Sequence, residues 1–500
     1  MSATPALPEQ GLSWLLAREG EIGFRVSAAR AAQRAWALVP VAERAERLAK
    51  AGDALISRMD EIVAVIREEN GKREVEALGH EVGGAVGAVR WTCANAPRLL
   101  AAEAAPVTWL PHRKPVIERV PLGVCVVISP WNFPVSIPLG QIVAGLVAGN
   151  AVLLKPSEWS PRCGALVVDL FRDCGLPADL LQLVQGDGRV GAALIDAKPE
   201  KVFFTGSLVT GRKVMAACAQ FPIPVSLELG GIDALIVCDD ADLELASSAA
   251  LWGATMNGGQ VCASVERILV DERVVDAFMG RLRAKAERLD PSDVGPCSMP
   301  LQSKVWERHL ADANKRGLNV AKYGAVSLID GPGVEASDVY RDETFGPIAA
   351  IATFRGDDDA ARLHNDTDFG LTASVFSADV DRAERLAKRL DAGLVSINDV
   401  AATMHAFAEL PWGGKGSSGF GRSHGEDGLR EFTMPRVIDR PRGGIPGFKR
   451  PWWYPYDGDQ VELIRAFVTI VGDRHTGRRV RSAGKLLTAF ASMMRRSPRL

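Results

Sequence analysis

Residues 257–264 read Asn-Gly-Gly-Gln-Val-Cys-Ala-Ser and place Cys262 in a small-residue turn after an apolar, helix-like run. A thiolate is a strong nucleophile, its pKa can fall near helix N-termini or cations, and glycines beside it let backbone N–H groups approach a reacting atom. Glu228 begins a Glu-Leu-Gly-Gly segment 34 positions before the thiol, from 228 to 262. This pair predicts covalent catalysis, with Cys262 as the nucleophile and Glu228 as the proton acceptor.

The residues near Cys262 in the sequence include no histidine, which leaves Glu228 as the candidate base for a hydrolytic step. The seven other cysteines lie in apolar or helical patterns, where cysteine usually acts as a small buried hydrophobe. They are Cys93, Cys125, Cys163, Cys174, Cys218, Cys238 and Cys297. Because neither a CxxC pair nor a Cys/His cluster occurs, we predict no metal site.

Composition excludes several classes of protein. The 500 residues carry a formal net charge of −2, which argues against nucleic-acid binding. The N-terminal residues do not resemble a secretory signal, and no apolar run reaches the roughly 20 residues that span a bilayer. We therefore expect a cytoplasmic protein in a reducing compartment, which suits a reactive thiol.

From Pro121 onward, short β-type runs alternate with helical runs, and the second half of the chain repeats the pattern. The predicted strands of the first half are 124–128, 151–154, 180–184 and 201–204, and the predicted helices are 137–147, 165–174, 190–197 and 209–218. Alternation at this spacing predicts an α/β fold with two doubly wound, mostly parallel sheets. Residues 27–110 read as a helical layer packed on a sheet. Ligands of such sheets bind at the carboxyl ends of the strands.

The unusual residues follow these strands. Asn132 lies in Ser-Pro-Trp-Asn-Phe-Pro at 129–134, and Lys155 and Glu158 after the second strand suit the two hydroxyls of a ribose. Gly188 belongs to a GxGxxG match at 186–191, which is weak because no acidic residue follows at the expected distance. Residues 205–211, Thr-Gly-Ser-Leu-Val-Thr-Gly, open a helix whose free N–H groups favour a phosphate. Together these motifs predict a nucleotide site.

The motifs taken together resemble the aldehyde dehydrogenase superfamily over roughly residues 25–440. They are SPWNFP at 129–134, KPSE at 155–158, FTGS at 204–207, ELGG at 228–231, GQVC at 259–262, ETFGP at 343–347 and PWGGKGSSGFGR at 411–422. The resemblance implies that Cys262 is the nucleophile, Glu228 the general base and Asn132 an oxyanion donor. It also implies oxidation of an aldehyde to a carboxylic acid, through a thiohemiacetal and a thioester on the cysteine.

The resemblance further implies a set of cofactor contacts. They are Ser129, Trp131, Lys155, Glu158, Gly188, Gly206, Ser207, Gly211, Leu229, Glu343 and Phe345. Lys155 and Glu158 match contacts to the adenosine ribose, and Glu343 and Phe345 match residues around the nicotinamide ribose. The carboxylate of Glu158 favours NAD because it repels a 2′-phosphate; NADP remains the second candidate because one branch of the family tolerates it despite this carboxylate.

Domain organisation follows from the same resemblance. It implies a Rossmann-like cofactor-binding domain in 1–112 and 121–229 and a catalytic domain in 230–428. Strands 113–120 and 429–442 form the expected oligomerisation element of a homodimer or homotetramer. Residues 443–500 form a C-terminal helical extension.

The sequence motifs define the class of substrate less closely than they define the reaction. Residues 397–399 and 423–428 resemble the class-3 branch, which acts on aromatic and fatty aldehydes, whereas residues 263–267 resemble other branches. We expect an aromatic or a medium- or long-chain aldehyde. The alternatives are a semialdehyde, transfer of the acyl group to CoA, against which Glu228 argues, and a catalytically silent scaffold, against which the intact catalytic set argues.

The C-terminal extension is basic and amphipathic. No acidic residue follows Asp473, and an apolar helical face runs from Leu486 to Met494. The basic residues are Arg474, Arg478, Arg479, Arg481, Lys485, Arg495, Arg496 and Arg499. This pattern is typical of a helix that lies on a membrane surface, so we expect peripheral membrane contact through 461–500. The alternative is packing on the protein's own acidic surface or on a sister subunit.

Overall fold

The computed structural model describes residues 19–105, 107, 113–441, 453, 454, 456 and 458–496, and of residues 19, 20 and 493–496 it describes the backbone alone. The side chains of Met493, Met494, Arg495 and Arg496, and the whole of Arg499, therefore lie outside it. The chain divides into two compact units, one of residues 1–102 and 118–436 and one of residues 103–117 and 437–500.

The first sheet of the larger unit has the strand order β15-β7-β6-β3-β4-β5. Its strands are β3 (Val124–Ile128), β4 (Ala151–Lys155), β5 (Leu181–Leu183), β6 (Lys201–Thr205), β7 (Val225–Glu228) and β15 (Gly419–Phe420). All neighbours pair in parallel except β15, which runs antiparallel to β7. The order reverses between β3 and β6, and such a switch point is where ligands of parallel sheets bind.

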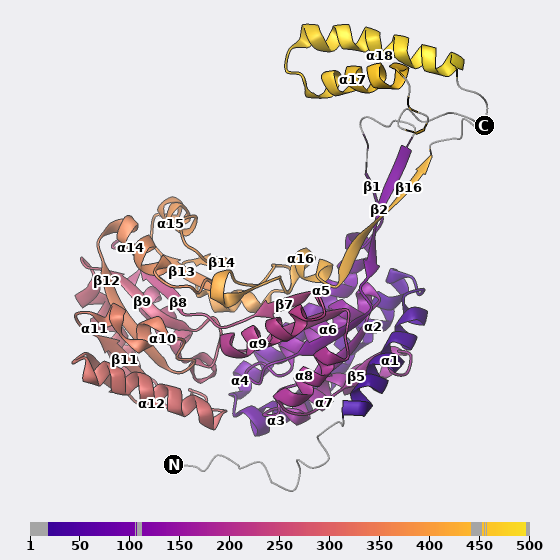
Figure 1. Ribbon diagram of the computed structural model, residues 1–500. Coiled ribbons are helices and arrows are strands. Elements are labelled where there is room, and N and C mark those ends of the chain that lie inside the picture. Colours follow the sequence, from indigo (N-terminus) through magenta and orange to yellow (C-terminus); the bar gives the residue numbers. More distant parts are fainter. Residues whose placement is uncertain are drawn as a thin grey trace. The chain divides into compact units, whose positions relative to one another are not determined.

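Helices cover both faces of this sheet (Figure 1). They are α1 (Glu19–Trp36), α2 (Val41–Ser57), α3 (Met59–Asn70), α4 (Glu74–Glu76), α5 (Gly84–Leu99), α6 (Ser136–Ala148), α7 (Pro161–Asp169), α8 (Gly188–Asp196) and α9 (Leu208–Ala219). A π-helical turn, η2 (Ala77–Gly83), joins α4 to α5. Every residue of β3 and β4 is buried, as expected for strands covered on both faces.

The second sheet has the order β10-β11-β12-β9-β8-β13-β14 and is parallel except for the β10–β11 hairpin. Its strands are β8 (Asp233–Val237), β9 (Val265–Asp271), β10 (Asn319–Tyr323), β11 (Val326–Asp330), β12 (Ile348–Phe354), β13 (Thr372–Phe376) and β14 (Leu394–Ile397). Along β8, Leu235 and Val237 enter one hydrophobic core, and Ala234 and Ile236 enter another. This alternation shows that the sheet buries both of its faces.

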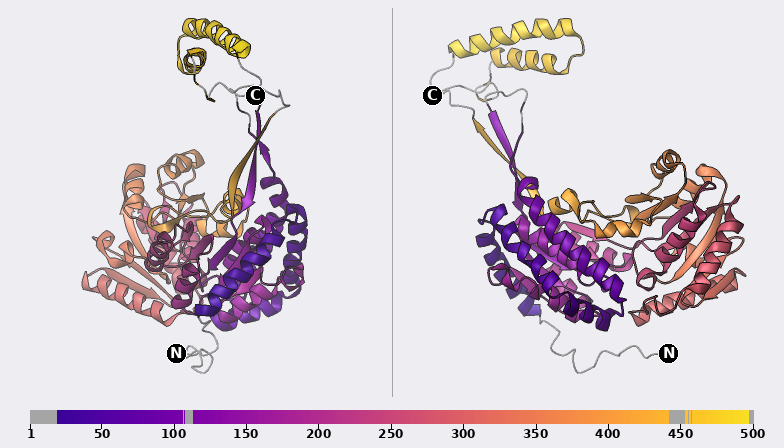
Figure 2. Two further views of the ribbon diagram at one scale, coloured as in Figure 1. Left: turned by 45° about the vertical axis from the view of Figure 1, so that its right-hand side comes forward. Right: turned by 180° about the vertical axis from the view of Figure 1, so that it is seen from behind.

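The helices of the second sheet complete the larger unit (Figures 1 and 2). They are α10 (Leu243–Thr255), α11 (Val275–Arg288), α12 (Pro300–Lys315), α13 (Asp338–Arg341), α14 (Gly356–Asn365) and α15 (Val380–Ala387). A last helix, α16 (Gly425–Arg430), returns to the first sheet and packs on α5 and α6. Short 3₁₀ turns include η4 (Met256–Gly259) and η6 (Ala401–Ala406). Two doubly wound parallel sheets confirm the predicted fold class.

The smaller unit contains β1 (Glu103–Ala104), which pairs with β2 (Arg113–Pro121) in a sheet of order β1-β2-β16, with β16 spanning Thr433–Pro441. It also contains α17 (Gly458–Gly472) and α18 (Thr476–Arg496). In the part of the chain that the structure describes, no helix has the length and apolar composition needed to cross a membrane.

Several sequence-based boundaries were wrong. The predicted helix 165–174 is α7, which ends at Asp169 because the chain turns there into a separate 3₁₀ turn, Arg172–Cys174. The helical layer ends at Leu99 and not near residue 110, and the β10–β11 hairpin was not predicted. Of the seven cysteines expected to be buried, Cys297 is half-buried, because it lies in the loop before α12.

Candidate active site

A left-handed turn presents Cys262. After α10 the chain passes through Asn257, Gly258 and Gly259, with φ angles of 51°, 66° and 69°. A Cβ atom on Gly259 would lie 2.2 Å from the backbone of Gly346, so only glycine fits this position. The turn thereby seats the cysteine loop against the loop that follows Glu343.

The Glu-Leu-Gly-Gly segment passes directly behind the cysteine. Strand β7 ends at Glu228, and a Cβ atom on Gly231 would lie 2.7 Å from the carbonyl oxygen of Cys262. A Cβ atom on Gly230 would lie 2.1 Å from the Glu343 carboxylate, which accepts a hydrogen bond from the Gly231 N–H at 3.1 Å. The two glycines therefore allow Glu228, Glu343 and Cys262 to converge from three separate segments.

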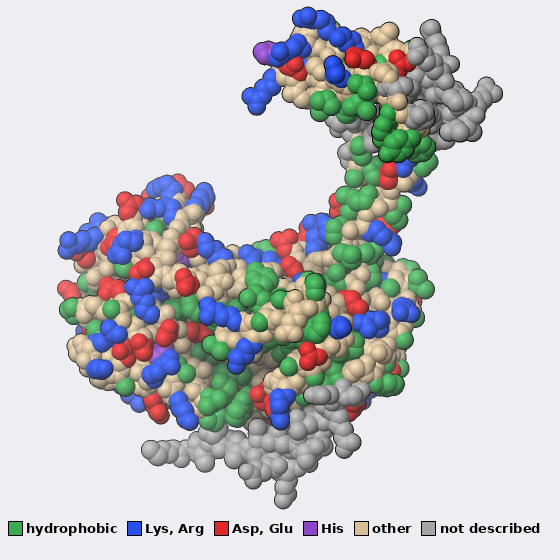
Figure 3. All heavy atoms as spheres, in the orientation of Figure 1, with side chains coloured by type: hydrophobic (Ala, Val, Ile, Leu, Met, Phe, Trp, Pro, Cys, Tyr) green, Lys and Arg blue, Asp and Glu red, His purple; other side chains and the backbone are tan. Residues whose placement is uncertain are grey.

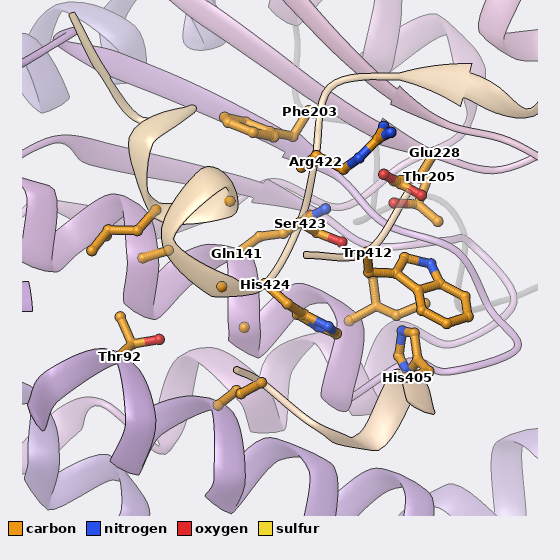
Figure 4. Close-up of a pocket in the computed structure, with 18 of the residues that line it drawn as sticks. Thr92, Gln141, Phe203, Thr205, Glu228, His405, Trp412, Arg422, Ser423 and His424 are labelled. Atoms are coloured by element: carbon orange, nitrogen blue, oxygen red, sulfur yellow. The ribbon is translucent and has the colours of Figure 1, made fainter. Parts of the chain in front are cut away.

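Cys262 and Glu228 line one cavity of about 50 Å³. Figure 4 shows Glu228 beside Thr205, with Gln141, His424 and Arg422 among the surrounding side chains. Thr205 Oγ1, Gln141 Oε1 and His424 Nδ1 are buried there without a hydrogen-bond partner in the described residues. A polar cavity of this size has room for water, and water would satisfy these atoms.

The protonation states at this cavity differ from the sequence-based expectation. Burial raises the pKa of the Cys262 thiol, and the carboxylates of Asp233, Glu228 and Glu343 raise it further. A hydrogen bond with the Ala263 backbone lowers this pKa, but burial and the acidic neighbours outweigh it. Burial also raises the pKa of Glu228 well above its usual range, against the opposing charge of Arg422. The thiol thus has to pass its proton to a base as it reacts, and Glu228 faces the same cavity.

Asn132 is held against the cysteine loop by buried hydrogen bonds. Its side-chain Nδ2 donates to the carbonyl oxygen of Gln260 at 3.0 Å. The backbone carbonyl oxygen of Asn132 accepts from Lys72 Nζ at 2.8 Å and from Asn257 Nδ2 at 3.3 Å. One N–H of the Asn132 amide remains for an oxyanion at the sulfur, as the predicted role requires.

Lys72 belongs to a buried ion pair that the sequence did not reveal. Its ammonium lies 2.6 Å from Glu81, with both side chains fully buried. The other oxygen of Glu81 accepts from the N–H groups of Val135 and Ser136 at 3.1 and 2.9 Å. The helical layer therefore does more than cover the sheet, because it fixes the loop that carries Asn132. Lys72 lies in the loop between α3 and α4 and Glu81 lies in η2, and nothing in the sequence around either residue marks it as buried or paired.

Three histidines surround Cys262, although none is near it in the sequence. His405 and His424 line the same cavity as Cys262, and His80 and His405 line a second one. The His405 ring lies 4.9 Å from Trp412 and 5.0 Å from His424, between ring centroids. Burial lowers the pKa of His405 well below its usual value and that of His424 to about 4, so both are neutral. Excluding histidine from the region was therefore wrong, because folding brings these residues to the sulfur.

The second cavity reaches Cys262 from the other side and measures about 240 Å³. None of the described residues that line it is charged at neutral pH. They are His80, Phe133, Trp252, Met256, Val261, Cys262, Ala263, Ala402, Thr403, His405, Ala406, Phe407 and Trp412. Cys262 thus lines two cavities, one that includes the charged side chains of Glu228 and Arg422 and one whose described lining holds no charged side chain.

The predicted nucleotide residues gather at the carboxyl ends of the first sheet. Ser129 follows β3, and its hydroxyl is buried with no partner in the described residues. Lys155 ends β4, with its ammonium 3.6 Å from the Glu158 carboxylate, and burial lowers its pKa. Ser207 caps α9 beside Gly206, accepting from the Thr210 N–H at 3.4 Å. The buried hydroxyl of Ser129 and the ion pair of Lys155 with Glu158 are groups that could hydrogen-bond a bound dinucleotide.

The remaining predicted contacts fall into three places. A Cβ atom on Gly211 would lie 2.5 Å from Leu229, so these two residues pack together. The rings of Trp131 and Phe345 meet edge to face at 5.6 Å, and Glu343 lies at the cysteine loop. Gly188 begins α8, whose N-terminus is capped by the carboxylate of Asp187, whereas α9 is capped by the neutral Ser207. The negative charge of Asp187 makes the start of α8 the poorer place for a phosphate.

Comparison with known proteins is extensive. The model of the aldehyde dehydrogenase family matches residues 3–438. The 4,4'-diapolycopene aldehyde oxidase of a Methylomonas species is 40% identical over 485 residues, covering 93% of this chain and 90% of that protein.

Solved structures give the same result. An NAD-dependent aldehyde dehydrogenase from Sinorhizobium meliloti superposes with a TM-score of 0.82 at 30% identity, covering 88% of this chain and 89% of that one. A betaine aldehyde dehydrogenase from Staphylococcus aureus in complex with NAD+ superposes with a TM-score of 0.81 at 26% identity, covering 87% and 90%.

Proposed function

Since the chain belongs to the aldehyde dehydrogenase family, we propose that it oxidises an apolar aldehyde, either aromatic or of medium or long chain, to the carboxylic acid with NAD as the hydride acceptor. The observation that carries this proposal is the position of Cys262. Cys262 lines one cavity together with Glu228, and it also lines a second cavity whose described lining holds no charged side chain.

In the first step, Cys262 Sγ forms a bond to the aldehyde carbon while its proton passes to Glu228. The carbonyl electrons move to oxygen, and the resulting oxyanion accepts hydrogen bonds from Asn132 Nδ2 and the Cys262 backbone N–H. A donor of this kind contributes about 3–4 kcal/mol to the transition state. The following oxidation needs a hydride acceptor, which is the chemistry that NAD supplies when bound, and the acyl group then remains on Cys262 as a thioester.

Hydrolysis then uses the polar cavity. Glu228 first releases the thiol proton to solvent. It then removes a proton from a water in this space, and the water oxygen attacks the thioester carbon. The carbon–sulfur bond breaks, the acid leaves, and Cys262 regains its proton. A base facing a water-sized space supports hydrolysis over transfer of the acyl group to CoA.

The cofactor would be held by the residues at the switch point between β3 and β6. Lys155 and Glu158 would bind the hydroxyls of the adenosine ribose, and the hydroxyl of Ser129 would hydrogen-bond to the cofactor. The start of α9 at Gly206 and Ser207 would bind a phosphate. The exposed carboxylate of Glu158 favours NAD over NADP because of its repulsion of a 2′-phosphate.

The apolar cavity supports the substrate class. A charged semialdehyde would find no partner of opposite charge among its described lining residues. Phe133, Trp252 and Phe407 offer instead an aromatic surface, which suits an aromatic ring or a hydrocarbon chain. The name of the Methylomonas relative, which is an aldehyde oxidase for diapolycopene aldehyde, supports the same class.

We also propose that the chain works as a homodimer or homotetramer through strands 113–120 and 429–442, in the cytoplasm. Strand β16 exposes Met434, Val437 and Ile438, an apolar set that a sister subunit would cover. The eight cysteines are free thiols, which suits a reducing compartment. The assignment of 1–112 and 121–229 to the cofactor and of 230–428 to catalysis belongs to the same proposal.

Two measurements test the function. Formation of NADH and NADPH is followed across short, long aliphatic, aromatic, charged and quaternary-ammonium aldehydes, with the product identified as free acid or acyl-CoA. We expect kcat/KM to rise with chain length or aromaticity and the product to be the free acid. A preference for charged aldehydes would overturn the substrate class. Aldehyde oxidation that is unchanged in Cys262→Ser would overturn the covalent mechanism, and no turnover of any aldehyde would favour a silent scaffold.

A further inference from the structure

The two C-terminal helices form an antiparallel hairpin with a small core of its own. Ser492 near the end of α18 donates to Asp459 at the start of α17 at 2.7 Å. Leu463 of α17 packs with Leu486 and Ala489 of α18. Each helix therefore packs one stripe of residues against the other helix of the hairpin, and the rest of its surface faces away from that contact.

Both helices carry a second apolar stripe outside this core. On α17 it consists of Val461, Ile464, Val468 and Val471, and on α18 of Val480 and Leu487. These six side chains are between 43% and 70% exposed. Their spacing of three, four or seven residues aligns them along one side of each helix.

The two stripes face the same way. Successive helical residues are rotated by about 100°, so the stripe of α17 lies about 120° from the inward-facing Leu463. The stripe of α18 lies about 140° from the centre of its inward set, Ser482, Leu486 and Ala489, in the same rotational sense. Because the helices are antiparallel, similar offsets of one sense turn both stripes to one face. We call this face, made of Val461, Ile464, Val468, Val471, Val480 and Leu487, the apolar face.

Three charges of α18 lie elsewhere on the hairpin. Arg478, Arg481 and Lys485 are rotated in the opposite sense from the inward set of α18 and so lie on the other side, whereas Arg479 is rotated in the same sense as the stripe and borders the apolar face. Figure 3 shows hydrophobic side chains gathered on one side of the hairpin and Lys and Arg side chains on another. Trp453, Tyr454 and Tyr456 are exposed just before α17.

We infer that the apolar face of this hairpin docks on the surface of a membrane that contains anionic lipids. An apolar face, a cationic polar face and neighbouring Trp and Tyr residues are the combination that binds helices in the plane of the lipid headgroups. The excess of Lys and Arg after Asp473 complements the negative charge of such a surface.

The docking surface is independent of the catalytic site and would deliver the enzyme to aldehydes dissolved in a bilayer, a consequence that rests on the proposed function. The test uses the full-length protein and vesicles of either purely zwitterionic lipid or zwitterionic lipid mixed with phosphatidylglycerol. We expect co-sedimentation with the anionic vesicles, weaker binding to the zwitterionic ones, and a loss of binding as salt is raised.

A matched pair of double variants identifies the docking face. Val468→Glu with Leu487→Glu places two carboxylates on the apolar face, and Thr469→Glu with Thr488→Glu places two on the opposite face. Both pairs change the net charge equally. We expect the first pair to weaken vesicle binding at least tenfold more than the second. Turnover of a water-soluble aldehyde should be unchanged in both, which shows that the proteins are folded and separates this test from that of the proposed function.

Three outcomes would overturn the inference. The first is a wild-type protein that binds neither kind of vesicle. The second is an equal loss of binding in the two double variants, which would mean that charge alone drives the contact. The third is a change of mass in analytical ultracentrifugation caused only by the apolar-face variants, without vesicle binding by the wild type, which would assign the face to a second copy of the chain.

Discussion

The two cavities that meet at Cys262 differ in size and in chemistry. The one shared with Glu228 measures about 50 Å³ and includes the charged Arg422 and buried polar atoms without partners, whereas the one shared with Phe133 and Trp252 measures about 240 Å³ and has no charged side chain in its described lining. Proton transfer to and from water needs the first environment, and selection of an apolar aldehyde needs the second. One sulfur atom between them serves both, so changes in either cavity should have separable effects.

Removal of the base in the polar cavity should have the largest effect. In Glu228→Gln we expect steady-state turnover to fall about 10²–10⁴-fold, the range for a lost general base. Alkylation of Cys262 by iodoacetamide should slow as well, because Glu228 accepts the thiol proton. Normal alkylation with lost turnover would restrict Glu228 to the hydrolytic step, and unchanged turnover would contradict its role as base.

Removal of the oxyanion donor should be next in size. Asn132→Ala should lower kcat about 10²–10³-fold with little change in KM, because its hydrogen bond to substrate oxygen forms mainly in the transition state. Stopped-flow measurement of the first turnover reports this step. A rise in KM at constant kcat would instead place Asn132 in ground-state binding.

The pH dependence should report the carboxyl group of the polar cavity. A base acts when deprotonated, and the pKa of Glu228 is raised, so kcat should increase as pH rises and reach its plateau well above the usual pKa of a glutamate. His424→Asn is the control, because the pKa of His424 is lowered to about 4 and its titration lies outside this range. A plateau already reached near the normal pKa of glutamate would contradict the assignment.

A change in the apolar cavity should have the smallest effect and should depend on the substrate. Trp252→Ala should reduce kcat/KM about tenfold for a long-chain or aromatic aldehyde, because part of the apolar contact area is lost. The rate with a two-carbon aldehyde should stay the same. Leu245→Ala, on the same helix but away from the cavity, is the matched control, and equal losses with short and long substrates would show that the two cavities are not separable.

Much of this arrangement could be predicted from the sequence. The alternation of strands and helices predicted both parallel sheets, and glycine-rich segments marked Glu228 and Cys262 because close backbone approach requires glycine. The motif after β3 likewise marked Asn132. These signals are local: they depend on residue types within a few positions of each other, which remain readable without the fold.

The sequence by itself thus determined the fold class and the chemical groups of the reaction. Only the tertiary structure decided what surrounds them. His80, His405 and His424 come from distant segments to the cavities that Cys262 lines. Lys72 and Glu81 form a buried ion pair that the sequence did not reveal, and the acidic neighbours of Cys262 raise its pKa. Desolvation and charge interactions depend on distance in space, and segments far apart in the chain acquire that proximity only when the core packs.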